Sequence, residues 1–426
     1  MALKVRALLG VLAVLASMFL VACSGSYHCQ VTFGSSGCTP PGSSGTGSGT
    51  GGGGGGNGSS VLVFAIDQAG TIDGYTLNNS GGTFQTTSGY TPPAVPANDG
   101  GVGLVVANQQ FLYAGFGVTE TIYGWSISSS GSLTPVSGSP YAAAFMSSVG
   151  NGQVTSSVIT NPTGTLLFFA STLGEIFVYQ IGSDGSLTAV TGSPFAAGIS
   201  PVNMTTDGLG KYLYATEGNV SHLGTEVAAF SIASNGALTP VAGSPFALPL
   251  WQVQGEPTGN FLIGTTGQSA GINGTDNNFL YVYSIQQTGA NAGALTAVTG
   301  SPFATQYSPY AIAVQPDTGG NLVYSFGFND DLSGFNPPEA YIIDPTTGAL
   351  SVVSGSPFSN AAEGSWGQFD QSGTNLFLWG EVKSSGTFSY PLSALEVGST
   401  GTLSQPTSPL DLNTQGFWTA TDPPTN

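Results

Sequence analysis

The chain has very few basic residues. Lys and Arg together number 4 of 426 residues, against 22 Asp and Glu, which gives a formal net charge of −18. The only arginine is Arg6, and the lysines are Lys4, Lys211 and Lys383. So acidic a chain repels nucleic acids and anionic lipid surfaces, and we expect neither as a partner. Beyond residue 6 it also has no guanidinium group to grip a phosphate with paired hydrogen bonds.

Charge of either sign is scarce, which restricts the fold. Charged residues make up 6% of the chain, whereas the exposed face of a helix normally carries Glu, Lys and Arg. Hydrophobic residues nevertheless reach 40%, with 5 Trp, 16 Tyr and 24 Phe, so most of the chain has enough apolar surface to fold. We expect an all-β protein whose surface is rich in Ser, Thr, Asn and Gly.

Residues 1–22 have the pattern of a secretory signal peptide. Lys4 and Arg6 precede an apolar stretch over residues 8–20, which is short for a transmembrane helix. The following Leu-Val-Ala-Cys sequence, ending at Cys23, resembles the lipobox of bacterial lipoproteins, in which the cysteine is lipidated and the leader is cut before it. The resemblance predicts a membrane-anchored lipoprotein; ordinary signal cleavage, with an unlipidated Cys23, is the alternative.

The residue after the lipobox bears on location within the cell envelope. Ser24 follows Cys23, and lipoproteins without Asp at this place resemble those sorted to the outer membrane of a two-membrane bacterium. We therefore expect an extracytoplasmic protein of the outer membrane, on its periplasmic or its exposed side. Without its leader the chain has two lysines against 22 acids, a formal charge of −20.

Residues 23–60 are predicted to form a flexible tether. Residues 39–60 are nearly all Gly, Ser, Thr and Pro, and such a segment buries nothing. Cys29 and Cys38 lie before it, and in an oxidising compartment the two thiols can form a disulfide. Metal binding together with His28 is the weaker alternative, because it leaves a tetrahedral site one ligand short.

Residues 61–426 consist of a repeated unit. The sequence Leu-Thr-x-Val-x-Gly-Ser-Pro-aromatic recurs every 51–57 residues, at 133–141, 187–195, 238–246, 295–303 and 350–358. Degenerate copies at 84–92 and 403–409 bring the number of units to seven. Each unit contains four short runs rich in Val, Ile, Tyr and Phe, joined by turns such as Asp184-Gly185 that favour tight hairpins. A period near 50 with four strands per unit predicts a seven-bladed β-propeller.

The two ends of the repeats predict how the ring closes. The first unit begins at Val61 with a second-strand run and lacks an inner strand. Residues 416–421, followed by Asp422-Pro423-Pro424, match an inner strand and its turn. We expect this C-terminal strand to complete the first blade, whose other strands come from residues 61–93, and so to protect the sheet edges.

The repeat pattern over residues 61–426 resembles the lactonase-type seven-bladed propellers, a family that includes 6-phosphogluconolactonases. In its enzymes an inner strand typically starts with Gly-Pro-Arg-His, and a second strand ends near Asn-Glu-Leu. Here Pro201 keeps the proline and Glu217 keeps the glutamate, but Val202 and Asn203 replace the arginine and the histidine. Because a sugar phosphate needs cationic recognition, phosphogluconolactone is not expected as the substrate.

Candidate site residues lie in the loops that follow the second strands. His222 is the only histidine of residues 61–426, between Glu217 and Glu226 in a predicted loop. Glu217 and His222 can act as a general-base pair, and His222 with Glu226 can bind a metal; an exposed loop whose members never meet is the alternative. Asp330 and Asp331, in the corresponding loop of the sixth unit, can bind calcium or simply be solvated.

Three further residues precede inner strands. Trp251, Glu363 and Trp366 are predicted to lie near the channel mouth, where aromatic rings beside carboxylates suit sugars or small polar ligands. Packing between blades is the alternative for both tryptophans.

These observations favour a binding function. We expect a monomeric, membrane-tethered propeller without cofactor or catalytic activity that binds a small molecule, a glycan or a protein through its loop face. The rival hypothesis is a lactonase-type hydrolase of an uncharged or cationic substrate, with Glu217 and His222 as the working pair. A structural component of the envelope is the third hypothesis.

Overall fold

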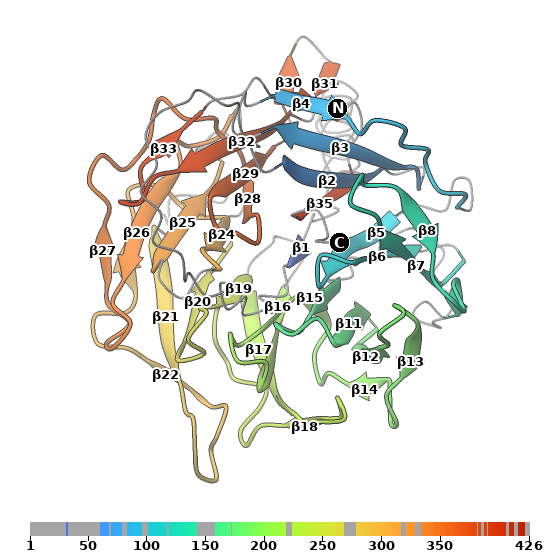
Figure 1. Cartoon of the computed structure of the whole chain (residues 1–426). Coiled ribbons are helices and arrows are strands. Elements are labelled where there is room, and N and C mark those ends of the chain that lie inside the picture. The colour runs from blue at the N-terminus through green and yellow to red at the C-terminus, as the bar shows by residue number, and fades with distance from the viewer. Residues whose placement is uncertain are drawn as a thin grey trace, which may run out of the picture.

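A computed structural model describes residues 31–32, 60–67, 70–78, 83–95, 101–116, 119–142, 158–171, 173–218, 224–267, 278–316, 321–328, 334–380, 382–384, 387–389, 391–405, 409–412 and 416–421. The regular elements in these ranges are all β-strands. They form seven antiparallel sheets around a central axis, and these are the blades of a propeller (Figure 1). The predicted fold is therefore confirmed. Of the predicted leader and tether, only residues 31–32 and 60 are described, and Cys23, Cys29 and Cys38 lie outside the described residues.

The first three blades follow the order of the repeats. Blade 1 contains β35 (Gly416–Thr421), β2 (Ser60–Asp67), β3 (Ile72–Asn78) and β4 (Thr83–Thr86). Blade 2 contains β5 (Gly101–Ala107), β6 (Phe111–Phe116), β7 (Thr121–Ile127), β8 (Leu133–Pro135) and β9 (Tyr141–Ala142). Blade 3 contains β10 (Val158–Thr160), β11 (Leu166–Ser171), β12 (Glu175–Ile181), β13 (Leu187–Ala189), β14 (Phe195–Ala196) and, parallel to β10, β1 (Val31–Thr32).

The other four blades repeat the same order from the inside outward. Blade 4 contains β15 (Pro201–Thr206), β16 (Tyr212–Gly218), β17 (Gly224–Ile232) and β18 (Leu238–Pro240). Blade 5 contains β19 (Gln252–Gly255), β20 (Phe261–Thr265), β21 (Phe279–Ile285), β22 (Leu295–Ala297) and β23 (Phe303–Ala304). Blade 6 contains β24 (Ala311–Val314), β25 (Leu322–Phe326), β26 (Glu339–Ile343) and β27 (Leu350–Val352). Blade 7 contains β28 (Trp366–Phe369), β29 (Asn375–Trp379), β32 (Pro391–Val397), β33 (Leu403–Ser404) and β34 (Leu410–Asp411).

The structure adds short strands that the repeat pattern did not predict. In four blades a two-residue strand (β9, β14, β23 or β34) pairs with the third strand of its sheet. Blade 7 also carries a separate hairpin of β30 (Val382–Ser384) and β31 (Thr387–Ser389) between its second and third main strands.

The C-terminal strand closes the ring as predicted. β35 pairs antiparallel with β2, from Leu62 opposite Thr421 to Asp67 opposite Gly416. β2 pairs on its other side with β3, so the first blade joins the two ends of the repeat region in one sheet. Figure 1 shows β35 beside the ring axis, next to β5 of the following blade.

The recurring Gly-Ser-Pro sequence has a structural explanation. The serine Oγ of each of the five full copies accepts the backbone N–H of a third-strand residue, at 2.8–3.0 Å. The preceding glycine has a φ between 82° and 95°, a conformation that other residues rarely adopt, and the Ser-Pro peptide is cis. The motif thus binds the outer strand of these five blades to its neighbour, and its recurrence reflects folding rather than catalysis.

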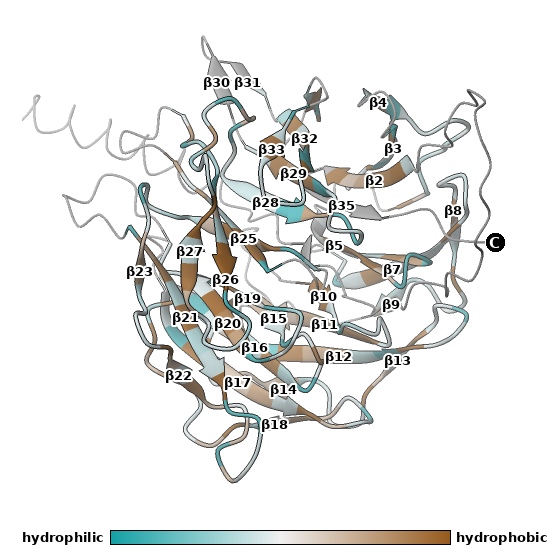
Figure 2. Cartoon of the chain, turned by 60° about the vertical axis from the view of Figure 1, so that its left-hand side comes forward, coloured by the Kyte–Doolittle hydropathy of each residue, from teal (hydrophilic) through white to brown (hydrophobic). Residues whose placement is uncertain are grey.

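Neighbouring blades interlock through the turn before each outer strand. A Cβ at Gly185 would lie 2.4 Å from the ring of Phe111 in the preceding blade, so only glycine allows this contact. The Tyr113 hydroxyl donates to the carbonyl oxygen of Gly185 at 2.7 Å, and Tyr214 and Tyr324 make the same bond to the next blade. Apolar side chains fill the layers between blades, and Figure 2 shows hydrophobic colour along the strands and more polar colour at the turns.

Candidate functional site

The inner strands carry the side chains that line the channel. The Gln254 Oε1 atom accepts the N–H of Val314 at 2.8 Å, and Thr205 Oγ1 accepts the N–H of Gly255 at 3.2 Å. Side chains of one inner strand therefore satisfy backbone groups of the next, and these strands run in the same direction. The channel consequently has two different ends. We call them the aromatic mouth, where Trp251, Tyr310 and Trp366 lie at the strand starts, and the amide mouth, where Gln254, Gln315 and Gln368 lie near the strand ends.

The aromatic mouth is closely packed. The Tyr310 ring lies 6.4 Å from that of Trp251 and meets that of Trp366 edge-on at 5.7 Å between centroids. Phe328 approaches Tyr310 at 5.3 Å. Trp251, Tyr310 and Trp366 are each only 4–6% exposed, and burial raises the pKa of the Tyr310 hydroxyl above its usual range. The two predicted tryptophans thus meet through Tyr310, which sequence reasoning did not select.

Two predicted carboxylates lie opposite one another on neighbouring strands. Glu217 is the last residue of β16 in regular register, and it pairs with Glu226 of β17. Because β17 begins at Gly224, Glu226 lies within a strand and not in the predicted loop. The Glu217 carboxylate accepts the N–H of Ser200 at 3.0 Å, immediately before β15. It therefore holds the start of an inner strand, which is a positioning role.

A buried carboxylate that sequence reasoning missed has the same role in blade 6. Glu339 is 3% exposed and accepts the N–H of Gln306 at 2.8 Å and the Tyr341 hydroxyl at 2.7 Å. Burial is the main reason why the pKa of Glu339 lies above its ordinary value. A glutamate at the start of the apolar sequence of β26 was the available signal.

The remaining predicted residues lie apart or outside the described part of the chain. Glu363 is exposed, and partial desolvation raises the pKa of its carboxyl. His222, Asp330 and Asp331 lie outside the described residues, so the proposed Glu217–His222 pair and the calcium site stay predictions. Within the ranges described, no three His, Cys, Asp or Glu side chains are grouped as metal ligands. No helix in those ranges is long and apolar enough to cross a membrane.

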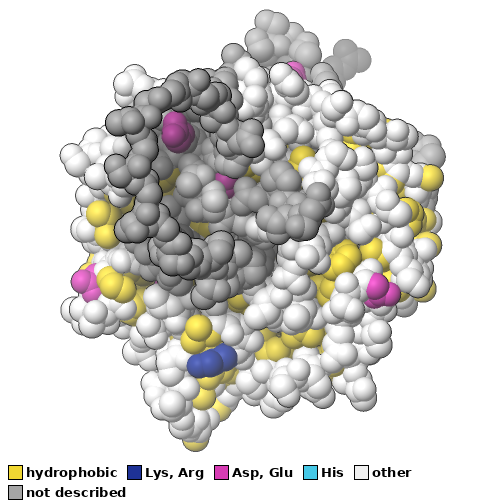
Figure 3. All heavy atoms as spheres, in the orientation of Figure 1, with side chains coloured by type: hydrophobic (Ala, Val, Ile, Leu, Met, Phe, Trp, Pro, Cys, Tyr) yellow, Lys and Arg dark blue, Asp and Glu magenta, His cyan; other side chains and the backbone are white. Residues whose placement is uncertain are grey.

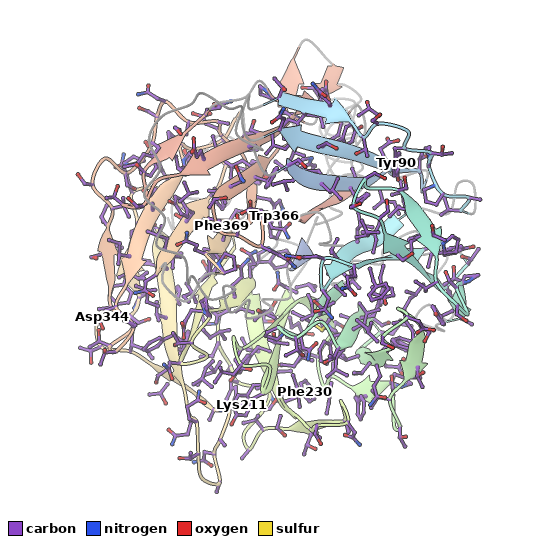
Figure 4. The ribbon with its side chains drawn as sticks, viewed as in Figure 1. Tyr90, Lys211, Phe230, Asp344, Trp366 and Phe369 are labelled. Carbon is purple, nitrogen blue, oxygen red and sulfur yellow. The ribbon has the colours of Figure 1, made fainter. Side chains whose placement is uncertain are left out.

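The amide mouth contains a cavity at the ends of β15, β19, β24 and β28. Its lining includes Thr205, Gln254, Gln315, Gln368 and Phe369. The cavity volume is about 70 Å³. A single water needs roughly 10–15 Å³ by the same measure, so the cavity holds several waters or one small molecule. Figure 4 labels Phe369 and Trp366, which lie near the ring centre at the two ends of β28.

Several polar atoms around this cavity are buried without partners. The Nε2 atom of Gln368, the Oε1 atom of Gln315 and the Oδ2 atom of Asp207 make no hydrogen bond. Gln315 is nevertheless fixed, because its Nε2 donates to the carbonyl oxygen of Gly373 at 2.9 Å. Gln368 is 8% exposed. Such a gathering is unusual, since buried polar atoms in folded proteins nearly always have a partner.

Buried acids near the same mouth are used to hold turns. Asp207 Oδ1 accepts the N–H groups of Lys211 and Tyr212, four and five residues later. Asp370 Oδ1 does the same for Thr374 and Asn375. Both carboxylates have no exposed surface, and burial raises the pKa of each. These acids brace hairpins, as Asn161 does through Thr165 and Leu166 in blade 3.

The surface near these turns carries little charge. None of the described residues that line the cavity is basic. Lys211, labelled in Figure 4, is exposed in the turn between β15 and β16. Figure 3 shows sparse charged side chains on a face that is mostly white and yellow.

Comparison with known proteins shows a likeness of fold. No protein-family model matches the chain, and no curated protein matches its sequence. A crystal structure of a protein from Lactobacillus plantarum is similar at 12% identity and a TM-score of 0.50, over 82% of this chain and 94% of that one. The present chain is a seven-bladed β-propeller.

Two more solved chains match less well. A functionally unknown protein from Desulfotomaculum acetoxidans aligns at 12% identity and a TM-score of 0.36, over 69% of this chain and 95% of its own. A chain of a mitotic checkpoint complex aligns at 13% identity and a TM-score of 0.47, over 78% and 86%.

Proposed function

We propose that this propeller is an extracytoplasmic binding module, held at the membrane by a lipid on Cys23 and a tether over residues 23–60. The signal-like leader, the lipobox resemblance and the Gly- and Ser-rich composition support the anchor. The ligand is a small molecule or a glycan, and a protein partner is the other expected class. The propeller fold is compatible with each of these, because function on such a scaffold depends on its site.

The observation that carries the binding function is the cavity at the amide mouth. It combines the amides of three glutamines and one acid, Asp207, with the ring of Phe369, the kind of lining that binds a small polar ligand. The described acids closest to the channel are occupied in holding turns or strand starts, as Asp207, Asp370 and Glu217 show. Such groups suit a rigid binding scaffold better than proton transfer.

A lactonase-type hydrolase is the second candidate. Glu217 occupies the glutamate position of that family, and the Ser200 N–H fixes its carboxylate beside Pro201. The family's histidine position holds Asn203, which is 3% exposed and cannot act as a base. Hydrolysis would therefore depend on His222 reaching Glu217.

Lactone turnover by the purified mature chain separates the two candidates. We expect no turnover of neutral or cationic lactones, and no difference between the natural chain and the His222→Ala variant. Turnover that disappears with His222→Ala but survives the surface change Glu396→Gln would support the hydrolase and contradict the binding module.

Fractionation tests the anchor separately. The natural chain is expected in the membrane fraction with a lipid label, and the Cys23→Ala variant in the soluble envelope fraction. A chain that is released from membranes with Cys23 intact would contradict the lipid anchor.

A further inference from the structure

We propose that the cavity at the amide mouth binds one small, uncharged polyol through Gln315 and Gln368. The inference rests on the proposed binding function and names its site and its ligand class. It follows from four features of the cavity: its place, its charge, its free hydrogen-bonding atoms and its rigidity.

The cavity lies where four blades meet, so it belongs to the closed ring and not to a single repeat. Thr205, Gln254, Gln315 and Gln368 come from blades 4, 5, 6 and 7. The cavity has a volume of about 70 Å³. By that measure the space exceeds what one water needs and suits a molecule with a few carbon and oxygen atoms.

The charge of the lining selects an uncharged ligand. No Lys or Arg is among the described residues that line the cavity, so a phosphate or carboxylate finds no cation there. The single acid of the lining is Asp207, whose Oδ1 accepts two backbone N–H groups while its buried Oδ2 makes no hydrogen bond and can accept one from a hydroxyl. Its burial raises its pKa, which weakens the site for a metal cation as well.

The free amide atoms match hydroxyl groups. Gln368 Nε2 is a donor without an acceptor, and Gln315 Oε1 is an acceptor without a donor. A hydroxyl both donates and accepts, so adjacent hydroxyls of a polyol can use both atoms while Gln315 Nε2 keeps its bond to Gly373. Phe369 and Pro316 supply apolar surface for the C–H groups between the hydroxyls.

The polar wall is held in place before any ligand arrives. Gln254 donates to the Ile312 carbonyl at 3.1 Å and accepts from Val314, while Gln315 is fixed to Gly373. Because these side chains are already ordered, a ligand loses little affinity to ordering them. Gln254 has both ends engaged, so we assign it to the wall and assign the ligand bonds to Gln315 and Gln368.

Calorimetric titration of the full mature chain tests the proposal, with glycerol, erythritol, myo-inositol and glucose as probes. We expect one of them to saturate the natural chain and to bind about tenfold more weakly to Gln368→Met and to Gln315→Met, which keep the side-chain length and remove the amide. Gln286→Met, at an exposed turn in blade 5, is the matched control and should bind as the natural chain does.

A crystal structure of the natural chain with the probe that binds keeps the test independent of variant folding. Ligand density between Gln315 and Gln368 is the expected result. Density only elsewhere, no saturation by any probe, equal binding by all variants, or binding of calcium or phosphate alone would overturn the polyol site. If another ligand bound at the aromatic mouth in these cases, the proposed binding function would stand while the polyol site failed; lactone turnover that depends on His222 would contradict the function itself.

Discussion

The two mouths of the channel are built from the two ends of the same inner strands, yet their chemistry differs. At the aromatic mouth, Trp251, Tyr310 and Trp366 fill the space and leave 4–6% of each side chain exposed. At the amide mouth, glutamines of three blades surround an open cavity, and one amide atom each of Gln315 and Gln368 is unpartnered. One mouth therefore contributes packing between blades, whereas the other offers hydrogen bonds to a ligand.

The position of a residue within the repeat determines its role. Residues before an inner strand pack across the top of neighbouring blades, and Tyr310 contacts rings from blades 5 and 7. Residues after an inner strand belong to a tight turn, where Asp207 and Asp370 brace the backbone. These carboxylates already place polar groups in the turns. The amide mouth therefore accommodates polar side chains, whereas the closely packed aromatic mouth would not.

Removal of β35 should have the largest effect, because both mouths need a closed ring. A chain that ends at residue 412 loses the inner strand of blade 1 and exposes the edge of β2. We expect it to lose its cooperative thermal transition in calorimetry. A shortened chain that melts with the transition of the natural one would show that the clasp is dispensable.

Tyr310→Ala should damage the aromatic mouth more than any single change damages the amide mouth. The ring is buried among Trp251, Phe328 and Trp366, so its loss leaves a cavity and should lower the free energy of unfolding by about 3–5 kcal/mol. Urea unfolding measures this. Gln315→Ala is the comparison variant, and a loss as large as that of Tyr310→Ala would contradict the division of roles.

Asp370→Ala should have an intermediate effect. Its carboxylate accepts from Thr374 and from the buried Asn375, and the change leaves both N–H groups without this acceptor, at a cost of about 2–3 kcal/mol. Asp344→Ala is the matched control, because Asp344 accepts from Thr346 and Thr347 in an exposed turn, as Figure 4 shows at the rim. Equal losses in urea unfolding would mean that burial of the brace contributes nothing.

A pH series should give the smallest effect, with a definite sign. Burial raises the folded-state pKa of Asp207 and Asp370 above the value of an unfolded Asp, so between those two values the folded chain binds more protons than the unfolded chain. Their contribution to stability is fully present below about pH 4 and is lost as the pH rises through the folded-state pKa. Lower pH also reduces the repulsion within a chain of net charge −18.

The melting temperature should therefore rise as the pH falls from about 7 to about 4.5. Asp207→Asn and Asp370→Asn together should reduce this rise, because amides do not titrate; Glu339, whose pKa burial also raises, should retain part of it. Asp184 and Asp344 are exposed, and hydrogen bonds lower the pKa of each, so they oppose the trend only at more acid pH. A melting temperature that falls steadily over the same range would contradict the assignment.

The fold could be predicted because its determinants are local and repeated. The Gly-Ser-Pro sequence marks the outer strand of five blades through one serine bond per copy, and Gly185 marks a turn where only glycine fits. The missing inner strand at Val61 and the surplus strand at residue 416 predicted the closure that β35 provides. The short strands after the Ser-Pro sequence were missed, since two residues give no periodic pattern.

The amide mouth could not be predicted in this way. Gln254, Gln315 and Gln368 lie in three different repeats, and glutamine has no motif that separates a cavity wall from a solvated surface. Most of the site residues predicted from the sequence are titratable, and Glu217 and Glu363 among them lie near the opposite end of the strands. The three amides come together only in the closed ring, so the sequence of a single repeat does not predict that they lie close to one another.

A crystal structure of the mature chain grown with a neutral polyol tests the division between the mouths most directly. We expect one ordered polyol molecule between Gln315 and Gln368, and undisturbed packing of Trp251, Tyr310 and Trp366 at the far end. A ligand seated among those three rings, with an empty amide mouth, would contradict it.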